Sequence, residues 1–272
     1  MQLKKTIGFF GAGNMARAII TGLIHSKLYQ AEEILVHNHR YQPTLEKLVT
    51  DLAVTPVSNR EDLLQQADIV ILAVKPHLIE ELLSDIKASI SEQQIILSIA
   101  AGITIDQMTA IIGTQRKIAR VMPNTPSLIG EGVSAVTVNQ QFNSAETNLV
   151  LSICQSFGHA EMVPEHLFDA VVGVSGSAPA YVYLFIEALA DGAVLKGMPR
   201  QQAYNFAAQT VLGAAKMVLT TDYHPGELKD MVTSPGGTTI AAVKELEDRQ
   251  LRSAVINAVK VAADKNHEMS QT

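Results

Sequence analysis

The 272-residue sequence has a single cysteine, Cys154, so the chain cannot form an internal disulfide, as expected in a reducing compartment. Its eight histidines are scattered and lack cysteine partners at zinc-finger spacing, so we expect no structural metal site. Basic residues are also scarce, because 21 Lys and Arg stand against 27 Asp and Glu, giving a net charge of -6. The acidic balance and the lack of a basic stripe argue against a nucleic-acid-binding protein.

Long apolar runs are missing too, since none approaches the roughly eighteen residues that span a bilayer. Lys4 and Lys5 precede an apolar stretch, as in a secretory signal, but Gly8, Gly11 and Gly13 interrupt that stretch at once. We therefore expect a cytoplasmic chain with no membrane partner. Because 47% of its residues are hydrophobic, the chain can bury a large core in one large or two modest domains.

The N-terminal glycines stand where a strand must turn sharply into a helix. Ile7–Phe10 predicts a buried strand, and Met15–Ile24 predicts a helix rich in alanine and isoleucine. Gly11 permits the tight turn, Gly13 lets a pyrophosphate approach the backbone, and Ala16 replaces the third glycine of G-x-G-x-x-G. The motif predicts a dinucleotide phosphate site at the helix start. A tight turn without a ligand is the alternative.

Over the first 164 residues, short apolar runs alternate with helical patterns. This alternation predicts βαβ units and a doubly wound, Rossmann-type parallel sheet covered on both faces. The later expected strands are Ile34–His37, Ile69–Val74, Ile95–Ile99, Lys117–Met122, Val133–Val138 and Ala160–Val163. The later expected helices are Thr44–Leu52, Leu78–Ile90, Ile105–Ile112 and Ala145–Phe157.

After Pro164 nearly everything has helical spacing, with much alanine. We therefore assign residues 1–164 to a dinucleotide-binding domain and residues 165–272 to an all-α domain. This helical half is unusually apolar, which favours a buried subunit interface. The alternative is a well-packed monomeric bundle. Pro179 predicts a kink in its apolar helix, either with Ser175 and Ser177 facing the nicotinamide or without catalytic meaning.

The end of the second strand selects the dinucleotide. NAD enzymes usually place an Asp or Glu there to hold the ribose 2′-hydroxyl. Here Asn38 and Arg40 follow the strand without a carboxylate, and both can donate to a 2′-phosphate. The sequence therefore favours NADPH, with NADH as the second option; a solvated loop charge is the alternative for Arg40. Asn59 is expected to reach the same adenosine end.

Further motifs follow other strands, where ligands bind in sheets of this kind. Lys75 is expected beside the nicotinamide ribose, or else is only a helix-start charge, and Pro76 suits the first helical turn. Ser98–Gly102 leaves room for a flat ring. Asn124 and Thr125 offer neutral donors towards the cleft, or else belong to a rigid structural turn.

A second glycine-containing loop, Val232–Thr239, precedes the expected helix Ile240–Leu246. Its exposed N–H groups suit an anion, but the loop is too small for another dinucleotide, so we expect a small carboxylate there. The alternative is that Thr238 and Thr239 merely cap the helix.

Together these motifs resemble the pyrroline-5-carboxylate reductases, the last enzymes of proline biosynthesis, over almost the full chain. They are Gly11–Ala16, Ala73–His77, Ala100–Gly102, Pro123–Pro126, Ser175–Tyr181, His224–Asp230 and, as the most specific, Val232–Glu247. The resemblance implies hydride transfer from NADPH, or from NADH, to the imine carbon of 1-pyrroline-5-carboxylate, giving L-proline. It also implies helical domains interlocked in a homodimer, which in some members assembles into a decamer.

The resemblance assigns roles residue by residue. It places the pyrophosphate against Phe10, Gly11, Ala12, Gly13, Asn14 and Met15, and the adenosine ribose and its phosphate against Asn38 and Asn59. It places the nicotinamide side against Ala73, Val74, Lys75, Pro76, Ile99, Ala100 and Ala101. It assigns the substrate to Glu165, Ser234, Gly237, Thr238 and Thr239. Thr239 is then the catalytic candidate, which orients the substrate or relays a proton to the imine nitrogen.

Two other functions stay open at this point. A β-hydroxyacid dehydrogenase shares the general plan but would need a catalytic lysine on the helix within Val171–Leu195, which contains none. A catalytically silent NADP-binding scaffold is the other, because a fold does not fix a function. The intact loop Ser234–Thr239 argues against the scaffold.

Overall fold

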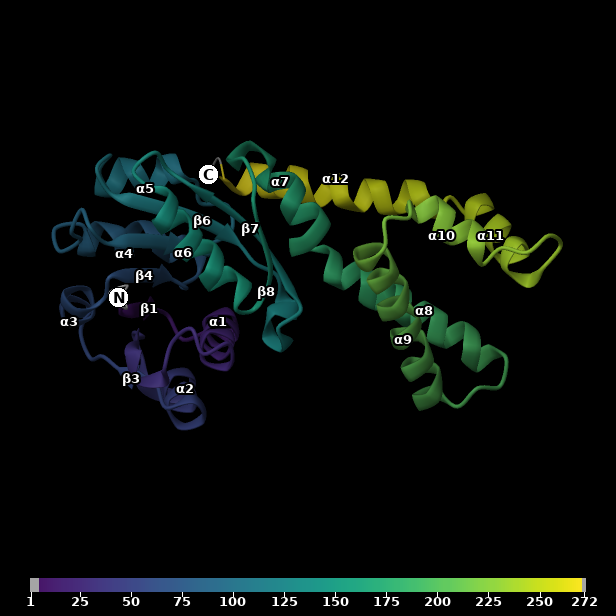
Figure 1. The fold of residues 1–272 in the computed structure, drawn as a ribbon, viewed down its shortest axis with the longest axis horizontal. Coiled ribbons are helices and arrows are strands. Elements are labelled where there is room, and N and C mark those ends of the chain that lie inside the picture. The colour runs from purple at the N-terminus through teal and green to yellow at the C-terminus, as the bar shows by residue number, and fades with distance from the viewer. Residues whose placement is uncertain (1–4, 271–272) are drawn as a thin grey trace. The chain divides into compact units, whose positions relative to one another are not determined.

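The computed structural model describes residues 5–270 and divides the chain into two compact units (Figure 1). The first unit runs up to Gly176 and includes the chain again from Ala262 onward, and the second unit is Ser177–Val261. The compact units thus divide further along the chain than Pro164. The functional division at residues 164 and 165 stays a prediction.

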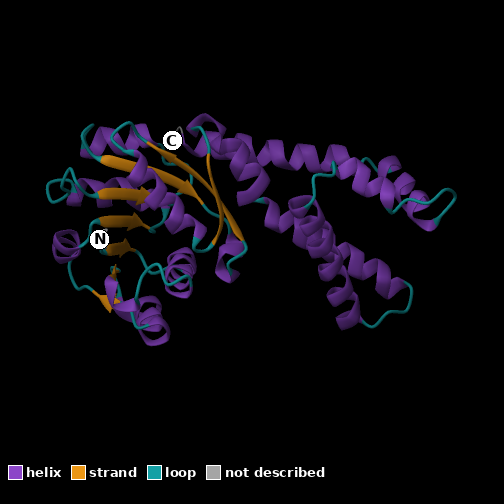
Figure 2. Ribbon diagram, in the orientation of Figure 1, coloured by secondary structure: helices purple, strands orange, loops and turns teal. Residues whose placement is uncertain are grey.

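The first unit is built on an eight-stranded sheet with helices on both of its faces (Figure 2). The strand order is β3-β2-β1-β4-β5-β6-β7-β8, and all neighbours are parallel except β6 and β7. The strands are β1 Ile7–Phe10, β2 Ile34–His37, β3 Thr55–Pro56, β4 Ile69–Leu72, β5 Ile95–Ser98, β6 Lys117–Met122, β7 Gly132–Val138 and β8 Gly158–Met162. This order confirms the predicted Rossmann-type sheet.

The α-helices of this unit lie close to their predicted bounds. They are α1 Asn14–His25, α2 Glu46–Leu52, α3 Arg60–Gln66, α4 Ile79–Ile86, α5 Ile105–Ile112, α6 Ser144–Gln155 and the short α7 Phe168–Val171. Two small elements, α3 and β3, were not predicted from the sequence. The strand is only two residues long and contains proline, and the helix is short and mostly polar, so neither leaves a clear apolar period.

Alternating side chains of the strands fill two cores, one on each face of the sheet. Ile7 and Phe9 belong to the core beneath α1, α2 and α6, whereas Phe10 belongs to the core beneath α3, α4 and α5. Gly8 lets α3 approach β1, because a Cβ there would lie 2.7 Å from Leu63 Cδ2. Strands buried on both faces explain why the sequence shows continuous apolar runs rather than alternation.

The second unit is helical. It contains α8 Ala178–Leu195, α9 Arg200–Thr220, α10 Pro225–Met231, α11 Thr238–Asp248 and the first part of α12 Leu251–Ser270. Small side chains, Ala190, Ala203 and Ala207, form its buried cluster where α8 packs against α9. Pro179 lies in the first turn of α8, directly after a π-helical segment at Val172–Gly176, so the predicted interruption of the apolar helix is confirmed.

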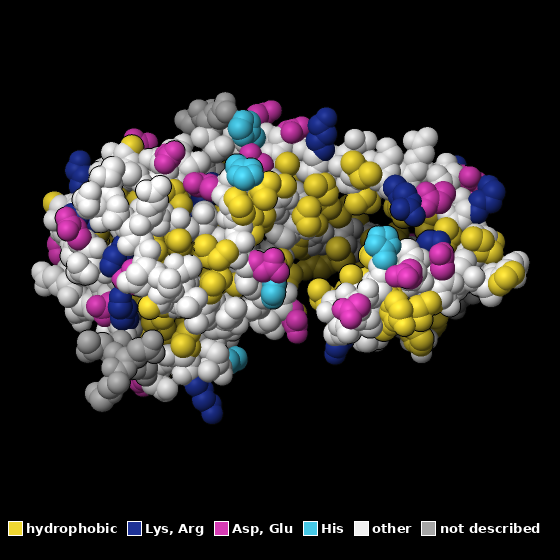
Figure 3. All heavy atoms as spheres, turned by 45° about the horizontal axis from the view of Figure 1, so that its top comes forward, with side chains coloured by type: hydrophobic (Ala, Val, Ile, Leu, Met, Phe, Trp, Pro, Cys, Tyr) yellow, Lys and Arg dark blue, Asp and Glu magenta, His cyan; other side chains and the backbone are white. Residues whose placement is uncertain are grey.

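Large apolar side chains remain exposed on the second unit. Yellow side chains gather over its helices in Figure 3. Leu184 is 66% exposed, Phe206 is 66% exposed and Leu219 is 84% exposed. A monomer rarely exposes so much contiguous apolar surface unless another molecule covers it. The alternative of a well-packed monomeric bundle therefore does not fit this unit.

One described helical stretch, residues 165–195, is long and apolar enough to cross a membrane by length and composition. The absence of a long uninterrupted apolar run, noted in the sequence, therefore does not exclude a stretch of high average hydropathy. Glycine, serine and single charged residues interrupt this stretch without lowering its average hydropathy greatly. Only 6% of its most apolar window is buried within the chain, so its surface needs a cover of some kind.

Candidate active site

The turn between β1 and α1 has the geometry of a phosphate site. Gly11 has φ +107, and a Cβ there would lie 2.5 Å from the carbonyl oxygen of Ala73, so only glycine fits. Gly13 is the N-cap of α1 and faces open space, because no described atom lies within 4 Å of its ideal Cβ position. None of the described side chains caps this first turn. Its N–H groups can therefore bind an anion.

A pocket of about 280 Å³ opens beside this turn, at the carboxyl ends of β1, β2 and β4. Its lining includes Phe10, Gly11, Asn38 and Val74, which were predicted cofactor residues. The complete lining is Phe10, Gly11, His37, Asn38, His39, Arg60, Val74, Leu78, Glu81 and Leu82. The structure therefore brings the phosphate turn and the loop after β2 to one cavity, where a doubly wound sheet binds its ligand.

The adenosine-end residues divide into two groups. The Asn38 amide donates to the carbonyl oxygen of Arg40 over 2.7 Å and so orders the loop after β2. Arg40 is exposed and lies outside the pocket lining. Asn59 caps α3, since its Oδ1 accepts from the amide of Asp62 over 2.7 Å. Sequence reasoning missed Arg60, which lines the pocket and pairs with Asp85.

Arg60 and His39 left a signal that could have been used. Because β3 and β2 are neighbours in the sheet, the residues following both strands meet at one edge. His39 stands between the two predicted residues of the loop after β2, and Arg60 directly follows Asn59. Neither was singled out, since the two-residue β3 gives only a faint pattern.

The nicotinamide-side residues follow β4 and β5, which are adjacent strands. The Ala73 amide donates to the carbonyl oxygen of Phe10 over 2.8 Å, and the Ile99 amide donates to that of Leu72 over 3.3 Å. Pro76 occupies the first turn of a 3₁₀ helix, as predicted, and Lys75 is the exposed residue before it. Residues 73–76 and 99–101 thus follow neighbouring strands at the sheet edge that carries the turn between β1 and α1, with β4 between β1 and β5.

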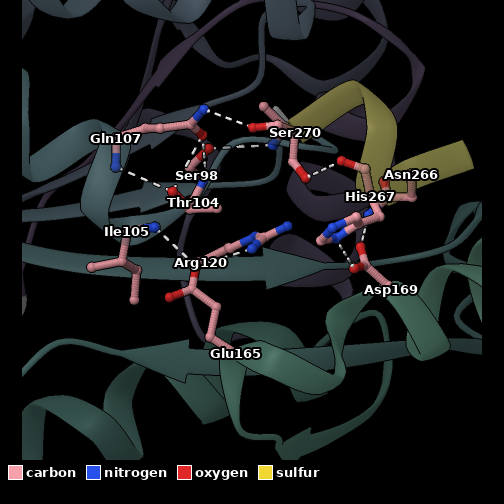
Figure 4. A network of polar contacts seen from close by, with 11 residues as sticks. Ser98, Thr104, Ile105, Gln107, Arg120, Glu165, Asp169, Asn266, His267 and Ser270 are labelled. Atoms are coloured by element: carbon pink, nitrogen blue, oxygen red, sulfur yellow. Dashed lines mark hydrogen bonds and ion pairs between the residues drawn. The ribbon is translucent and has the colours of Figure 1, made fainter. Parts of the chain in front are cut away.

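Glu165 is held by the first unit itself (Figure 4). Its Oε1 accepts from the Ile105 amide over 2.9 Å and from Arg120 Nη1 over 2.9 Å. Arg120 is only 5% exposed, and its guanidinium lies 4.6 Å from the centroid of the Phe168 ring. The acid predicted for the substrate side is therefore also the partner of a buried cation.

The loop after β6 uses its polar groups within the protein. Asn124 is buried, its amide nitrogen donates to the Ser175 carbonyl oxygen over 3.1 Å, and its Oδ1 accepts from the Val133 amide over 2.9 Å. The Ser175 hydroxyl donates to the carbonyl oxygen of Val171. These contacts favour the rigid structural turn over a set of donors aimed at a ligand.

The predicted substrate loop lies in the second unit, before α11. Gly237 is the N-cap of that helix, and none of the described side chains caps it, so Thr238 and Thr239 are the first helical residues rather than caps. A Cβ at Gly237 would lie 2.5 Å from Ser234 Oγ, so glycine is needed for the Ser234 hydroxyl to fold back over the turn. The first turn of α11 carries two threonines, and its N–H groups have no side-chain cap, a combination that suits a small anion.

Comparisons with known proteins match both halves of the chain. A family model described as pyrroline-5-carboxylate reductase dimerisation matches residues 165–269. A second one, described as NADP oxidoreductase coenzyme F420-dependent, matches residues 6–102. The pyrroline-5-carboxylate reductase of Escherichia coli (strain K12) is 47% identical over 273 residues, covering 99% of this chain and 100% of that protein.

Solved structures agree with these matches. A pyrroline-5-carboxylate reductase from Coxiella burnetii has a TM-score of 0.92 at 35% identity, covering 99% of this chain and 100% of its own. Pyrroline carboxylate reductase from Plasmodium falciparum with NADP bound has a TM-score of 0.88 at 32% identity, covering 98% of each chain. The resemblance found in the motifs and the predicted NADP(H) cofactor are thereby confirmed, as is a homo-oligomer acting on a small molecule. The chain belongs to the pyrroline-5-carboxylate reductase family and is an NAD(P)H-dependent oxidoreductase of proline biosynthesis.

Proposed function

We propose that the loop Ser234–Thr239 binds the carboxylate of 1-pyrroline-5-carboxylate and that Thr239 orients the imine or relays its proton. The observation that carries this proposal is the uncapped start of α11, where Gly237 replaces a capping side chain. The first-turn N–H groups and the hydroxyls of Thr238 and Thr239 then remain available for an anion. Glycine at 237 also keeps Ser234 Oγ next to this turn.

The strand ends of the first unit hold NADP(H) in this proposal. The turn Phe10–Met15 binds the pyrophosphate, and Asn38, Arg40 and Asn59 bind the adenosine end. The residues that follow β4 and β5, Ala73–Pro76 and Ile99–Ala101, bind the nicotinamide. Bound NADPH supplies the hydride that reduces the imine carbon. The chain positions the imine, excludes water and supports a proton at its nitrogen, since an iminium accepts hydride more readily than a neutral imine. Positioning alone can contribute up to about 7–11 kcal/mol.

The proposed assembly is a homodimer made through the helical domain, residues 165–272, with a decamer of five such dimers as a larger form. The exposed apolar residues of α8 and α9 support this proposal. A partner subunit would cover the apolar stretch 165–195 in place of lipid, and the protein would then act in the cytoplasm without a membrane partner. The match of residues 165–269 to a dimerisation model supports the same surface.

The test compares Thr239→Ala with Thr239→Ser, which keeps the hydroxyl. NADPH oxidation is followed with 1-pyrroline-5-carboxylate and with 1-pyrroline, which lacks the carboxylate. We expect Thr239→Ala to lower kcat substantially at unchanged NADPH affinity, and Thr239→Ser to retain most activity. We also expect the intact protein to prefer the carboxylated imine. Equal turnover of both imines would refute the carboxylate role, and equal loss of NADPH binding in the alanine variant would show that the loop is structural.

A further inference from the structure

Within the first unit, the last turns of α12 are joined to α7 by a hydrogen-bonded cluster that includes one buried residue, Asn266 (Figure 4). Asn266 is only 4% exposed, and its Nδ2 donates to Asp169 Oδ1 over 2.6 Å. The second carboxylate oxygen of Asp169 lies 3.0 Å from His267 Nδ1. One carboxylate on α7 therefore holds two consecutive residues of a helix that lies almost a hundred positions later in the chain.

The same turns reach the loop that follows β5. Gln107 Nε2 donates to the carbonyl oxygen of Ser270 over 3.0 Å, and Gln107 Oε1 accepts from the Thr104 amide over 2.8 Å. Gly102 has φ +77, and a Cβ there would lie 3.8 Å from the backbone of Met269. The end of α12 thus lies against the backbone that directly follows residues 99–101.

We propose that Asn266 is a positioning residue, which fixes the end of α12 on Asp169 and thereby holds the loop 99–102 in place for the nicotinamide. This inference rests on the proposed nicotinamide site at Ile99–Ala101. Ile99, Ala100 and Ala101 are apolar, so their side chains cannot hydrogen-bond a nicotinamide ring, and the site depends on where their backbone lies. A backbone shift of about 1 Å can cost up to about a hundredfold in turnover.

The cluster can be broken without leaving a cavity. Asn266→Asp keeps the side-chain volume but places a second carboxylate against Asp169 Oδ1, where the amide now donates over 2.6 Å. The double variant Asp169→Asn with Asn266→Asp restores one donor and one acceptor with reversed polarity, so recovery in it would show that the two residues act as a pair. Asn257→Asp is the matched control, because it makes the same charge change at an exposed position of the same helix.

Two measurements test whether Asn266 positions this loop. Steady-state kinetics with 1-pyrroline-5-carboxylate give kcat and KM, and hydrogen exchange of peptides covering residues 99–110 reports the loop with and without NADPH. We expect Asn266→Asp to lower kcat about ten- to a hundredfold and to speed exchange of this segment, while affinity for 2′,5′-ADP, an adenosine-end fragment, is unchanged. The double variant should recover most of both effects, and Asn257→Asp should behave like the parent protein.

The outcomes separate the inference from the site on which it rests. If NADPH does not slow exchange over residues 99–101 in the parent protein, the nicotinamide site itself is misplaced. If NADPH protects the segment and Asn266→Asp leaves kcat and exchange unchanged, only the positioning role fails. A loss of 2′,5′-ADP affinity equal to the loss in kcat, or no recovery in the double variant, would show general damage and would also overturn the inference.

Discussion

Arg120 Nη1 lies 2.9 Å from Glu165 Oε1, so a buried strand cation is paired with the residue that begins the helical half of the sequence. The Arg120 side chain is 6% exposed, whereas that of Glu165 is 30% exposed. The arginine is therefore the more desolvated partner. The Glu165 carboxylate and the Phe168 ring offset the free-energy cost of burying its charge. Substitutions at Glu165 should act on folding as well as on substrate binding.

The first prediction concerns this pair. Glu165→Gln keeps an oxygen that can accept from the Ile105 amide but removes the charge opposite Arg120. Losing one partner of a fully buried pair costs about 3–5 kcal/mol, and the partial exposure of Glu165 lowers our expectation to about 2 kcal/mol. Urea unfolding followed by circular dichroism measures the change. Glu161→Gln, whose side chain is 69% exposed beside His159, is the control and should change stability little.

The second prediction concerns cofactor choice. Arg60 lines the pocket with Asn38 and His39, whereas Arg40 lies outside it. A charge-assisted bond to a 2′-phosphate contributes about 1.5–3 kcal/mol, so Arg60→Gln should weaken NADPH binding about ten- to a hundredfold and leave NADH nearly unchanged. Arg40→Glu should also weaken NADPH more than NADH, by repulsion. Titration of cofactor fluorescence measures both. If the ratio of the NADPH and NADH affinities is unchanged in either variant, that arginine does not bind the 2′-phosphate.

The sheet and the cofactor edge were predictable because both follow from local rules. Buried parallel strands leave apolar runs such as Ile34–His37 and Lys117–Met122, and the structure has these two strands at the predicted bounds. Parallel strands also bring their carboxyl ends to one edge, so a motif after each strand predicts a shared site. Gly11 was predictable from another local rule, since a tight turn from a strand into a helix needs glycine. The structure agrees, because the positive φ of Gly11 and its close approach to Ala73 permit no side chain.

Contacts between distant segments were not predictable. Asp169 and Asn266 are polar residues on helices, and nothing in their local spacing indicates that they meet. The role of Glu165 as partner of Arg120 was missed for the same reason, because the two residues come from a strand and from a 3₁₀ turn much later in the chain. Periodicity shows which face of an element is buried, but it does not show which partner covers it.

The third prediction tests the apolar surface of the second unit. Leu184→Glu places a charge on α8 where the parent side chain is 66% exposed in the single chain. If a second subunit covers this surface, the variant should lose assembly and sediment as a smaller species. Leu128→Glu is the matched control, because Leu128 is 46% exposed on the first unit. Analytical ultracentrifugation decides the matter; an unchanged mass of the Leu184 variant would place the interface elsewhere.

The last prediction concerns Cys154, the single thiol. It is fully buried in α6, and burial raises the pKa of the thiol from 9.0 to about 12. At pH 8 about one molecule in 10⁴ then carries a thiolate, so the folded protein should not react with a disulfide reagent such as dithionitrobenzoate. Because the folded-state pKa lies above the unfolded value, this group favours folding below about pH 9, and the contribution is lost as the pH rises towards 12.

Absorbance of the released thiolate at pH 8 measures the reaction, with one equivalent expected in concentrated urea and almost none without it. Cys154→Ser should release none in either condition, which shows that the signal comes from this residue. Rapid reaction of the folded protein would mean that α6 opens locally, at much lower free energy than global unfolding. Because Cys154 belongs to the same core as Ala16 and Ile19 of α1, such opening would also loosen the helix whose first turn is the proposed phosphate site.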